Sequence, residues 1–141
     1  KNLERHRKVI TLHGMKIEIS NGEIVDKMTI LELKLDKIKN IVQLENITKE
    51  WEILNDCVMN LFQIFGDKSL YNKVDQLSEV NSKLWDIEDW IRDCEKEKRF
   101  DKEFVELARS VYRLNDERSE IKRHINLLTK SRLVEEKSYS K

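Results

Sequence analysis

The chain has no proline and only three glycines among its 141 residues. Proline removes a backbone donor and its ring clashes with the preceding turn, so its absence excludes the commonest cause of helix interruption. The glycines, Gly14, Gly22 and Gly66, fall outside or at the edges of the regions with regular apolar spacing. The composition therefore permits long, uninterrupted helices.

Neither sign of charge is in excess, because 27 Lys and Arg residues balance 27 Asp and Glu residues. Proteins that coat a phosphate backbone need a basic excess or a basic stripe, so we expect no nucleic-acid partner. No apolar run approaches the roughly 18 to 20 residues of a membrane span, and residues 1–14 lack the apolar core of a secretory signal. We therefore expect a cytoplasmic protein with no membrane partner.

Cysteine and histidine are scarce and widely spaced. Cys57 and Cys94 form no framework of disulfide pairs, and at helical apolar positions we expect both to be buried, reduced thiols. His6, His13 and His124 show none of the ligand spacings of zinc sites. The sequence also lacks a Gly-rich phosphate loop and a nucleophile with a recognisable local base. We accordingly predict no metal and no cofactor.

The chain is rich in apolar residues at helical spacing, with charged residues between them. Steps of three and four place such residues on one stripe of a helix, which is typical of helices that pack on a neighbour. Four stripes recur: Ile24, Met28, Leu31, Leu35, Ile38 and Val42; Ile47, Trp51, Leu54, Val58, Leu61 and Phe65; Leu70, Val74, Leu77, Val80, Leu84, Ile87, Ile91 and Cys94; Phe104, Leu107, Val111, Leu114, Arg118, Ile121, Ile125 and Leu128. The phase shifts near residues 40–48, which leaves open whether the first two helices are continuous.

Residues suited to helix ends separate the stripes. Ser20 followed by Glu23 predicts a capping box, in which the Ser hydroxyl accepts from the third helical residue and the Glu side chain reaches back. Gly66 can adopt the left-handed conformation that ends a helix. The N-caps expected for the two following helices are Asp67 or Ser69, and Asp101.

These patterns predict an all-α fold, an elongated antiparallel bundle of three to four long helices. Helices of 25 to 30 residues would be roughly 40 Å long, and short connections make neighbours antiparallel. A bundle of few long helices leaves stripes uncovered, so we expect a second copy to bury Trp51, Trp85 or Trp90.

The expected organisation is a single domain with two extensions. Residues 15–131 form the helical domain, residues 1–14 an N-terminal extension, and residues 132–141 a tail that either frays or packs back on the body. Alternating apolar residues at 9–12 and 15–19 also suit a short strand or hairpin before the first helix.

Two segments carry a resemblance to a known family. The segment GEIVDKMTILELKLDKI at residues 22–38 and the segment LARSVYRLNDER at residues 107–118, with the later Lys122–Asn126, resemble a family of bacterial and phage proteins that carries a domain-of-unknown-function label. The resemblance covers most of residues 15–139. It implies a prokaryotic or viral origin, and it implies no activity, cofactor or partner.

Arg118 occupies a position in the fourth stripe where the spacing calls for an aliphatic side chain. A buried guanidinium must be paired, because desolvating it alone costs several kcal/mol. One interpretation is an ion pair with a carboxylate on the first or third helix, for example Asp26 or Asp86, and another is that the side chain reaches solvent. The functional interpretation is an anion site that holds a phosphate or carboxylate. Its candidate residues are Lys27, Arg109, Arg118 and Lys122.

A run of acidic residues along the third apolar stripe is a weaker candidate for a functional site, in this case a metal site. Steps of three and four align them on one helix face, and carboxylates at that spacing can hold Mg²⁺. The residues are Asp86, Asp89, Asp93 and Glu97. Because basic residues such as Lys83 and Arg92 are interleaved and no second acidic helix is evident, an ordinary solvated face is the favoured interpretation.

The leading hypothesis is a protein–protein interaction or structural module, most simply a homodimer or a bundle that presents one helix face to a partner protein. We favour a protein without enzymatic activity, because no strong catalytic signature is present. The alternative is a small helical enzyme or a binder of an anionic metabolite, with its site around Arg118. Convergence of the four basic candidates on one open pocket would favour the alternative.

Overall fold

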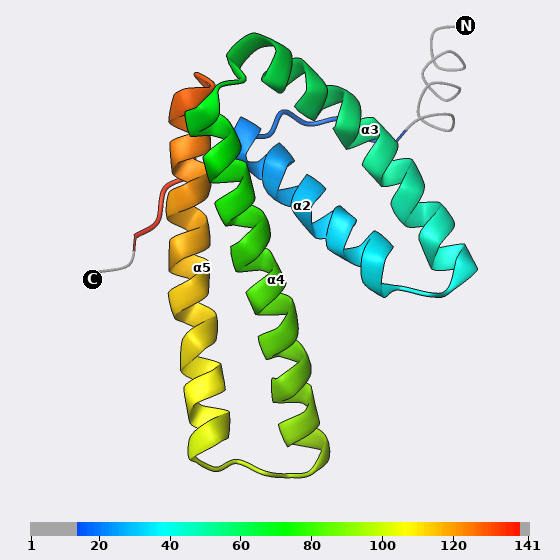
Figure 1. Ribbon diagram of the computed structural model, residues 1–141, viewed down its shortest axis with the longest axis vertical. Helices are drawn as coiled ribbons and strands as arrows, with labels where there is room; N and C mark the ends of the chain where they lie inside the picture. The colour runs from blue at the N-terminus through cyan, green and yellow to red at the C-terminus, as the bar shows by residue number, and fades with distance from the viewer. Residues whose placement is uncertain (1–13, 139–141) are drawn as a thin grey trace, which may run out of the picture.

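The computed structural model describes residues 14–138, and within this range the chain forms helices and no strands. The helices are α2 (Asn21–Lys37), α3 (Ile41–Phe65), α4 (Lys68–Lys96) and α5 (Lys102–Leu128), as Figure 1 shows. The predicted all-α bundle of three to four long helices is confirmed. None of these helices is long and apolar enough to cross a membrane.

The helices form two antiparallel hairpins, α2 with α3 and α4 with α5 (Figure 1). Helix α2 is central, because it packs against α3, α4 and α5. The α2–α3 hairpin joins the other pair near the end of α5 and then diverges from it (Figure 1). The far halves of α4 and α5 therefore extend beyond α2, and we call this projecting part, residues 85–115, the arm.

Each helix begins at a side chain that accepts a hydrogen bond from a backbone N–H three residues on. The pairs are Ser20 with Glu23 (3.1 Å), Asn40 with Gln43 (3.0 Å), Asp67 with Leu70 (2.8 Å) and Asp101 with Phe104 (3.2 Å). The predicted caps at Ser20, Asp67 and Asp101 are confirmed. The predicted return of the Glu23 side chain to the start of the helix, the second contact of the capping box, is wrong. The Glu23 carboxylate instead pairs with Lys122 of α5.

The phase shift near residues 40–48 marks a new helix. Helix α2 ends where Ile38 adopts an extended conformation, and Asn40 caps α3. The next connection differs from expectation, because Gly66 is extended (φ −61°, ψ 112°) and not left-handed. Glycine is required there for another reason: a Cβ atom would overlap the Phe62 carbonyl oxygen and the Tyr71 hydroxyl.

The core is built from the apolar stripes of all four helices. Its buried members are Val25, Met28, Val58, Leu70, Leu77, Val80, Ile121 and Ile125. Burying a side chain of this kind stabilises the fold by about 1.5–3 kcal/mol. The core lies where α2 crosses α4 and α5, so beyond its base the arm consists of α4 and α5 packed on each other.

Two further expectations fail. Cys94 is buried as predicted, but Cys57 is exposed, because it precedes the buried Val58 by one residue and so lies about 100° around α3. Residues 15–19 are irregular and do not form a strand, and residues 9–12 lie outside the described range. Among the tryptophans, Trp51 and Trp85 are half-buried, whereas Trp90 on the arm is 53% exposed.

Candidate functional site

A buried carboxylate lies where α2 crosses the other hairpin. Asp26 is 0% exposed, and Arg118 of α5 binds it with two groups. Arg118 Nε donates to Asp26 Oδ1 at 2.9 Å, and Nη2 donates to Oδ2. These hydrogen bonds raise the pKa of Arg118 above its ordinary value, although burial acts in the opposite direction. Arg118 is therefore held as a cation in a bidentate ion pair.

Helix α4 completes the coordination of this carboxylate. Asn81 Nδ2 donates to Asp26 Oδ1 at 2.9 Å and to Thr29 Oγ1 at 2.8 Å, and the Thr29 hydroxyl donates to the Asp26 carbonyl oxygen at 2.8 Å. Asn81 and Thr29 are both buried. The cluster joins side chains from α2, α4 and α5, and we call Asp26, Thr29, Asn81 and Arg118 the polar clamp.

A second cation adjoins the clamp and is also paired. Lys122 Nζ pairs with Glu23 and lies 3.8 Å from Asp26 Oδ2. Two cations, Arg118 and Lys122, thus stand against two carboxylates, Asp26 and Glu23. The fixed charges cancel, so the cluster presents little net positive charge to an incoming anion.

The other residues singled out in the sequence lie apart from this cluster. Lys27 is exposed, because it follows Asp26 by one residue and lies about 100° around α2. Arg109 is on the arm, where it pairs with Glu106 at 3.3 Å. Asp86 is exposed on α4, as are the other members of the acidic run. The structure thus brings Asp26, Arg118 and Lys122 together and leaves the remaining candidates separate.

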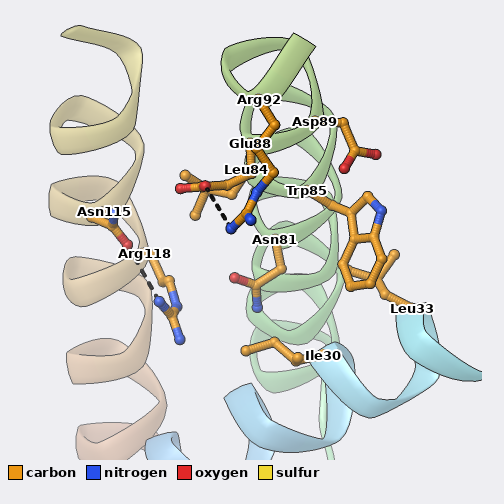
Figure 2. A pocket seen from close by; sticks show the side chains of 10 residues that line it. All are labelled: Ile30, Leu33, Asn81, Leu84, Trp85, Glu88, Asp89, Arg92, Asn115 and Arg118. Atoms are coloured by element: carbon orange, nitrogen blue, oxygen red, sulfur yellow. Dashed lines mark hydrogen bonds and ion pairs between the residues drawn. The ribbon is translucent and has the colours of Figure 1, made fainter. Parts of the chain in front are cut away.

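Next to the clamp, a cleft of about 570 Å³ opens between α2 and the start of the arm. It is lined by Ile30 and Leu33 from α2, Asn81, Leu84, Trp85, Glu88, Asp89 and Arg92 from α4, and Asn115 and Arg118 from α5 (Figure 2). Figure 2 shows Trp85 beside Leu33, and Arg92 turned toward Glu88, with which it pairs at 3.7 Å. The cleft combines an apolar floor with a rim that carries charges of both signs.

Sequence reasoning missed a second polar cluster, at the start of α2. The backbone N–H of Gly22 donates to Asn126 Oδ1 at 2.6 Å, and Ser20 Oγ donates to Glu135 Oε1 at 2.7 Å. A Cβ atom at position 22 would overlap the Lys122 carbonyl oxygen, so glycine permits this close approach. The C-terminal segment is thereby attached to the body of the protein.

Glu135 is the titratable group of this second cluster. Burial acts to raise the pKa of the Glu135 carboxyl, but hydrogen bonds from Ser20 and Asn126 and the charge of Lys122 hold it below its ordinary value. Two signals pointed to the cluster in the sequence. Asn126 stands directly beside the apolar stripe at Ile125, and a glycine falls within the first turn of a helix.

The described residues offer few groups for chemistry. In residues 14–138 no group of three or more His, Cys, Asp or Glu side chains could hold a metal ion. Within the same range, one buried side-chain polar atom has no hydrogen-bond partner, the indole nitrogen of Trp51 in the core. The buried polar side chains are thus satisfied by one another, which is typical of groups that fix the arrangement of helices.

Residues 15–141 match the sequence model of a family described as a family of unknown function (DUF6165). No curated protein and no solved structure matches the chain. The family description assigns no activity, and the bacterial or phage origin suggested by the resemblance stays an expectation. Because the match extends over all but the first fourteen residues, the chain belongs to this family.

Proposed function

We propose that this protein is a helical scaffold that acts by associating with protein and not by catalysis. The observation that carries the proposal is the exposure of apolar side chains on the arm. Trp90, Phe100, Val105 and Tyr112 are each about half exposed, at 53%, 53%, 49% and 55%. Val105 and Tyr112 lie within about 60° of Ala108 on one face of α5, and apolar side chains exposed on one face are typical of a surface that a partner covers. Trp90 lies on another face, about 160° around α4 from Glu88. Exposed apolar side chains also occur outside the arm, for example Ile41, Ile53 and Ile64 of α3.

The polar clamp supports the same proposal, because its groups are already engaged. Arg118 uses two donor groups on Asp26, and a third nitrogen, Nη1, donates to Asn115 Oδ1 at 3.3 Å. Lys122 is paired as well. These contacts position α2 against α4 and α5, and they leave the cluster few free donors for a substrate.

Site-specific photocrosslinking in the cells that naturally produce the protein tests the proposal. A photoreactive amino acid is placed in the full chain at Ala108, which is exposed on the arm toward the cleft, and at the matched position Arg113, exposed on the other side of α5. We expect an adduct from position 108 that mass spectrometry identifies as one defined protein, and none from position 113. Absence of an adduct at position 108, or equal adducts at both positions, would refute the proposal.

A binder of an anionic metabolite is the second candidate. Arg92 and Arg118 both line the cleft, and two guanidinium groups could hold a phosphate or carboxylate there. The carboxylates of Glu88 and Asp89 on the same rim act against this function, because they repel an anion. Thermal unfolding with inorganic phosphate and with citrate measures such binding, since a ligand stabilises the folded state by mass action. A rise in Tm that disappears in Arg92→Gln would favour this function, and no rise at millimolar ligand would exclude these anions.

A further inference from the structure

One face of α5 continues past the end of α2 without a cover. Asn115 and Arg118 line the cleft, and steps of four and three place Phe104, Ala108 and Val111 on the same face of the helix. Ala108 is exposed, and Phe104 and Val111 are half-buried. Nearer the end of α5 this face is covered by α2, which diverges before the arm (Figure 1). Along the arm, Phe100 at the tip packs edge-on against Phe104, with ring centroids 5.1 Å apart, and Ala108 stays exposed.

Residues of similar type lie at equal distances before and after Ala108 on this face. Phe104 and Tyr112 lie four residues to either side, and Val105 and Val111 lie three residues to either side. When two copies of a helix pack antiparallel about a twofold axis, residues equally distant from the centre face each other. Aromatic residues then face aromatic residues and valine faces valine. At the centre stands the only alanine of the chain, whose small side chain permits a close approach of the two helices.

Helix α4 carries an ion pair near the same level of the arm. Asn81 and Arg118 both bind Asp26, so these residues of the two antiparallel helices lie level with each other. Ile91 lies ten residues after Asn81 on α4, and Ala108 lies ten residues before Arg118 on α5. Ile91 and Ala108 are therefore level with each other as well. Glu88 lies three residues before Ile91 and Arg92 one residue after it, and the two side chains pair with each other at 3.7 Å. Both charges therefore lie near the axis of an antiparallel pair of arms and cancel there.

The accessible surface is also larger than that of a compact monomer. It amounts to 10814 Å² for a chain of 17.0 kDa. A compact monomer of this mass exposes about 7,700 Å². Residues 1–13 and 139–141, about 2.0 kDa, account for at most about 2,900 Å² as an unfolded chain. The remaining 15 kDa or so then expose about 7,900 Å², against about 7,000 Å² for a compact monomer of that mass, an excess of roughly 900 Å². That area is about what one partner contributes to a standard protein–protein interface.

We infer that the partner of the arm is a second copy of this chain. The two arms lie antiparallel about a twofold axis at Ala108 and form a four-helix bundle. The tip of each arm, residues 97–101, then reaches the cleft of the other copy, where Phe100 meets Trp85 and Leu33. This inference rests on the proposed function, because it names the protein that the exposed arm binds.

Light scattering coupled to size-exclusion chromatography of the full chain tests the inference. We expect a mass of twice 17.0 kDa at micromolar concentration. Ala108→Glu places two like charges together at the centre and should weaken association at least about tenfold. The matched variant Arg113→Glu, on the same helix but about 140° away from Ala108, should leave the dimer intact. A wild-type monomer, or an Ala108→Glu dimer of unchanged affinity, would overturn the inference.

Disulfide trapping tests the antiparallel arrangement independently of Ala108→Glu. In a chain with Cys57→Ser, which removes the exposed thiol, Ala108→Cys should form an intermolecular disulfide under mild oxidation and Arg113→Cys should not. Equal cross-linking at both positions would exclude a twofold axis at Ala108. If the protein is monomeric but position 108 crosslinks to a different protein in cells, the inference fails while the proposed function stands.

Discussion

Removing one member of the Asp26–Arg118 pair should destabilise the protein far more than removing both. In Arg118→Leu the carboxylate of Asp26 stays fully buried with only Asn81 as a direct donor and Lys122 at 3.8 Å. Leaving a buried charge without its partner costs about 3–5 kcal/mol. In Asp26→Leu the stranded group is Arg118, whose side chain is 27% exposed and can turn into the cleft. We expect a smaller loss there, about 2–4 kcal/mol.

In the double variant Asp26→Leu/Arg118→Leu neither charge is stranded, and Asn81 keeps its hydrogen bond to Thr29. Replacing a buried ion pair by apolar residues is often neutral or stabilising. The free energy of unfolding should therefore fall by at least about 2 kcal/mol less than the sum of the two single losses.

Urea unfolding followed by far-ultraviolet circular dichroism measures all three free energies. The matched control is the exposed pair Arg109–Glu106 on the same helix, 3.3 Å apart. Arg109→Leu should change the free energy of unfolding by less than about 1 kcal/mol, because exposed pairs contribute little. Strict additivity of the two single losses, or a loss in Arg118→Leu no larger than that in the control, would refute the role assigned to the clamp.

Three further changes test other parts of the structure. Gly22→Ala should lower the free energy of unfolding by about 1–3 kcal/mol, because its Cβ overlaps the backbone of α5; Gly14→Ala, which meets no atom within 4 Å, should have no measurable effect in the same urea titration. The pKa of Glu135 is lowered in the folded state, so its carboxylate contributes stability above its unfolded pKa and loses it as the pH falls through the folded pKa. Glu135→Gln should therefore be less stable than wild type at pH 7, and the difference should disappear under acid; a constant difference would contradict this. Cys57 should react with a thiol reagent in the native protein, whereas Cys94 should react only on unfolding.

The sequence predicted the helices well because each one is specified locally. Caps such as Asp67 and Asp101 lie within a few residues of the backbone groups they satisfy, and apolar spacing reports which face is buried. Arg118 could be recognised as paired because it interrupts an apolar stripe. Which carboxylate it contacts is set by the crossing of α2 over α5, a tertiary feature that no local pattern encodes.

Asp26 was one of two carboxylates proposed from the sequence as a partner of Arg118, whereas the clamp residues Thr29 and Asn81 were not found, for a related reason. A stripe of apolar residues predicts one buried face, but α2 contacts three helices and therefore buries more of its circumference. Polar residues beside the stripe become buried as well, and they are tolerated because they satisfy one another. Cys57 shows the opposite case: α3 lies at the edge of the bundle, so only one narrow face of it is covered.

The clamp also explains why a neutral polar cluster lies where apolar residues would pack. Apolar side chains tolerate small sliding of one helix along another, whereas the bond directions of Asn81 and Arg118 on a single carboxylate define one alignment of α4 and α5. That alignment brings Ile91 level with Ala108 and so places the Glu88–Arg92 ion pair near the centre of the arm. A slip of one helical turn would shift this ion pair by about 5.4 Å along the symmetric pattern of α5. The buried polar contacts of α2 thus set the register on which a self-complementary arm depends.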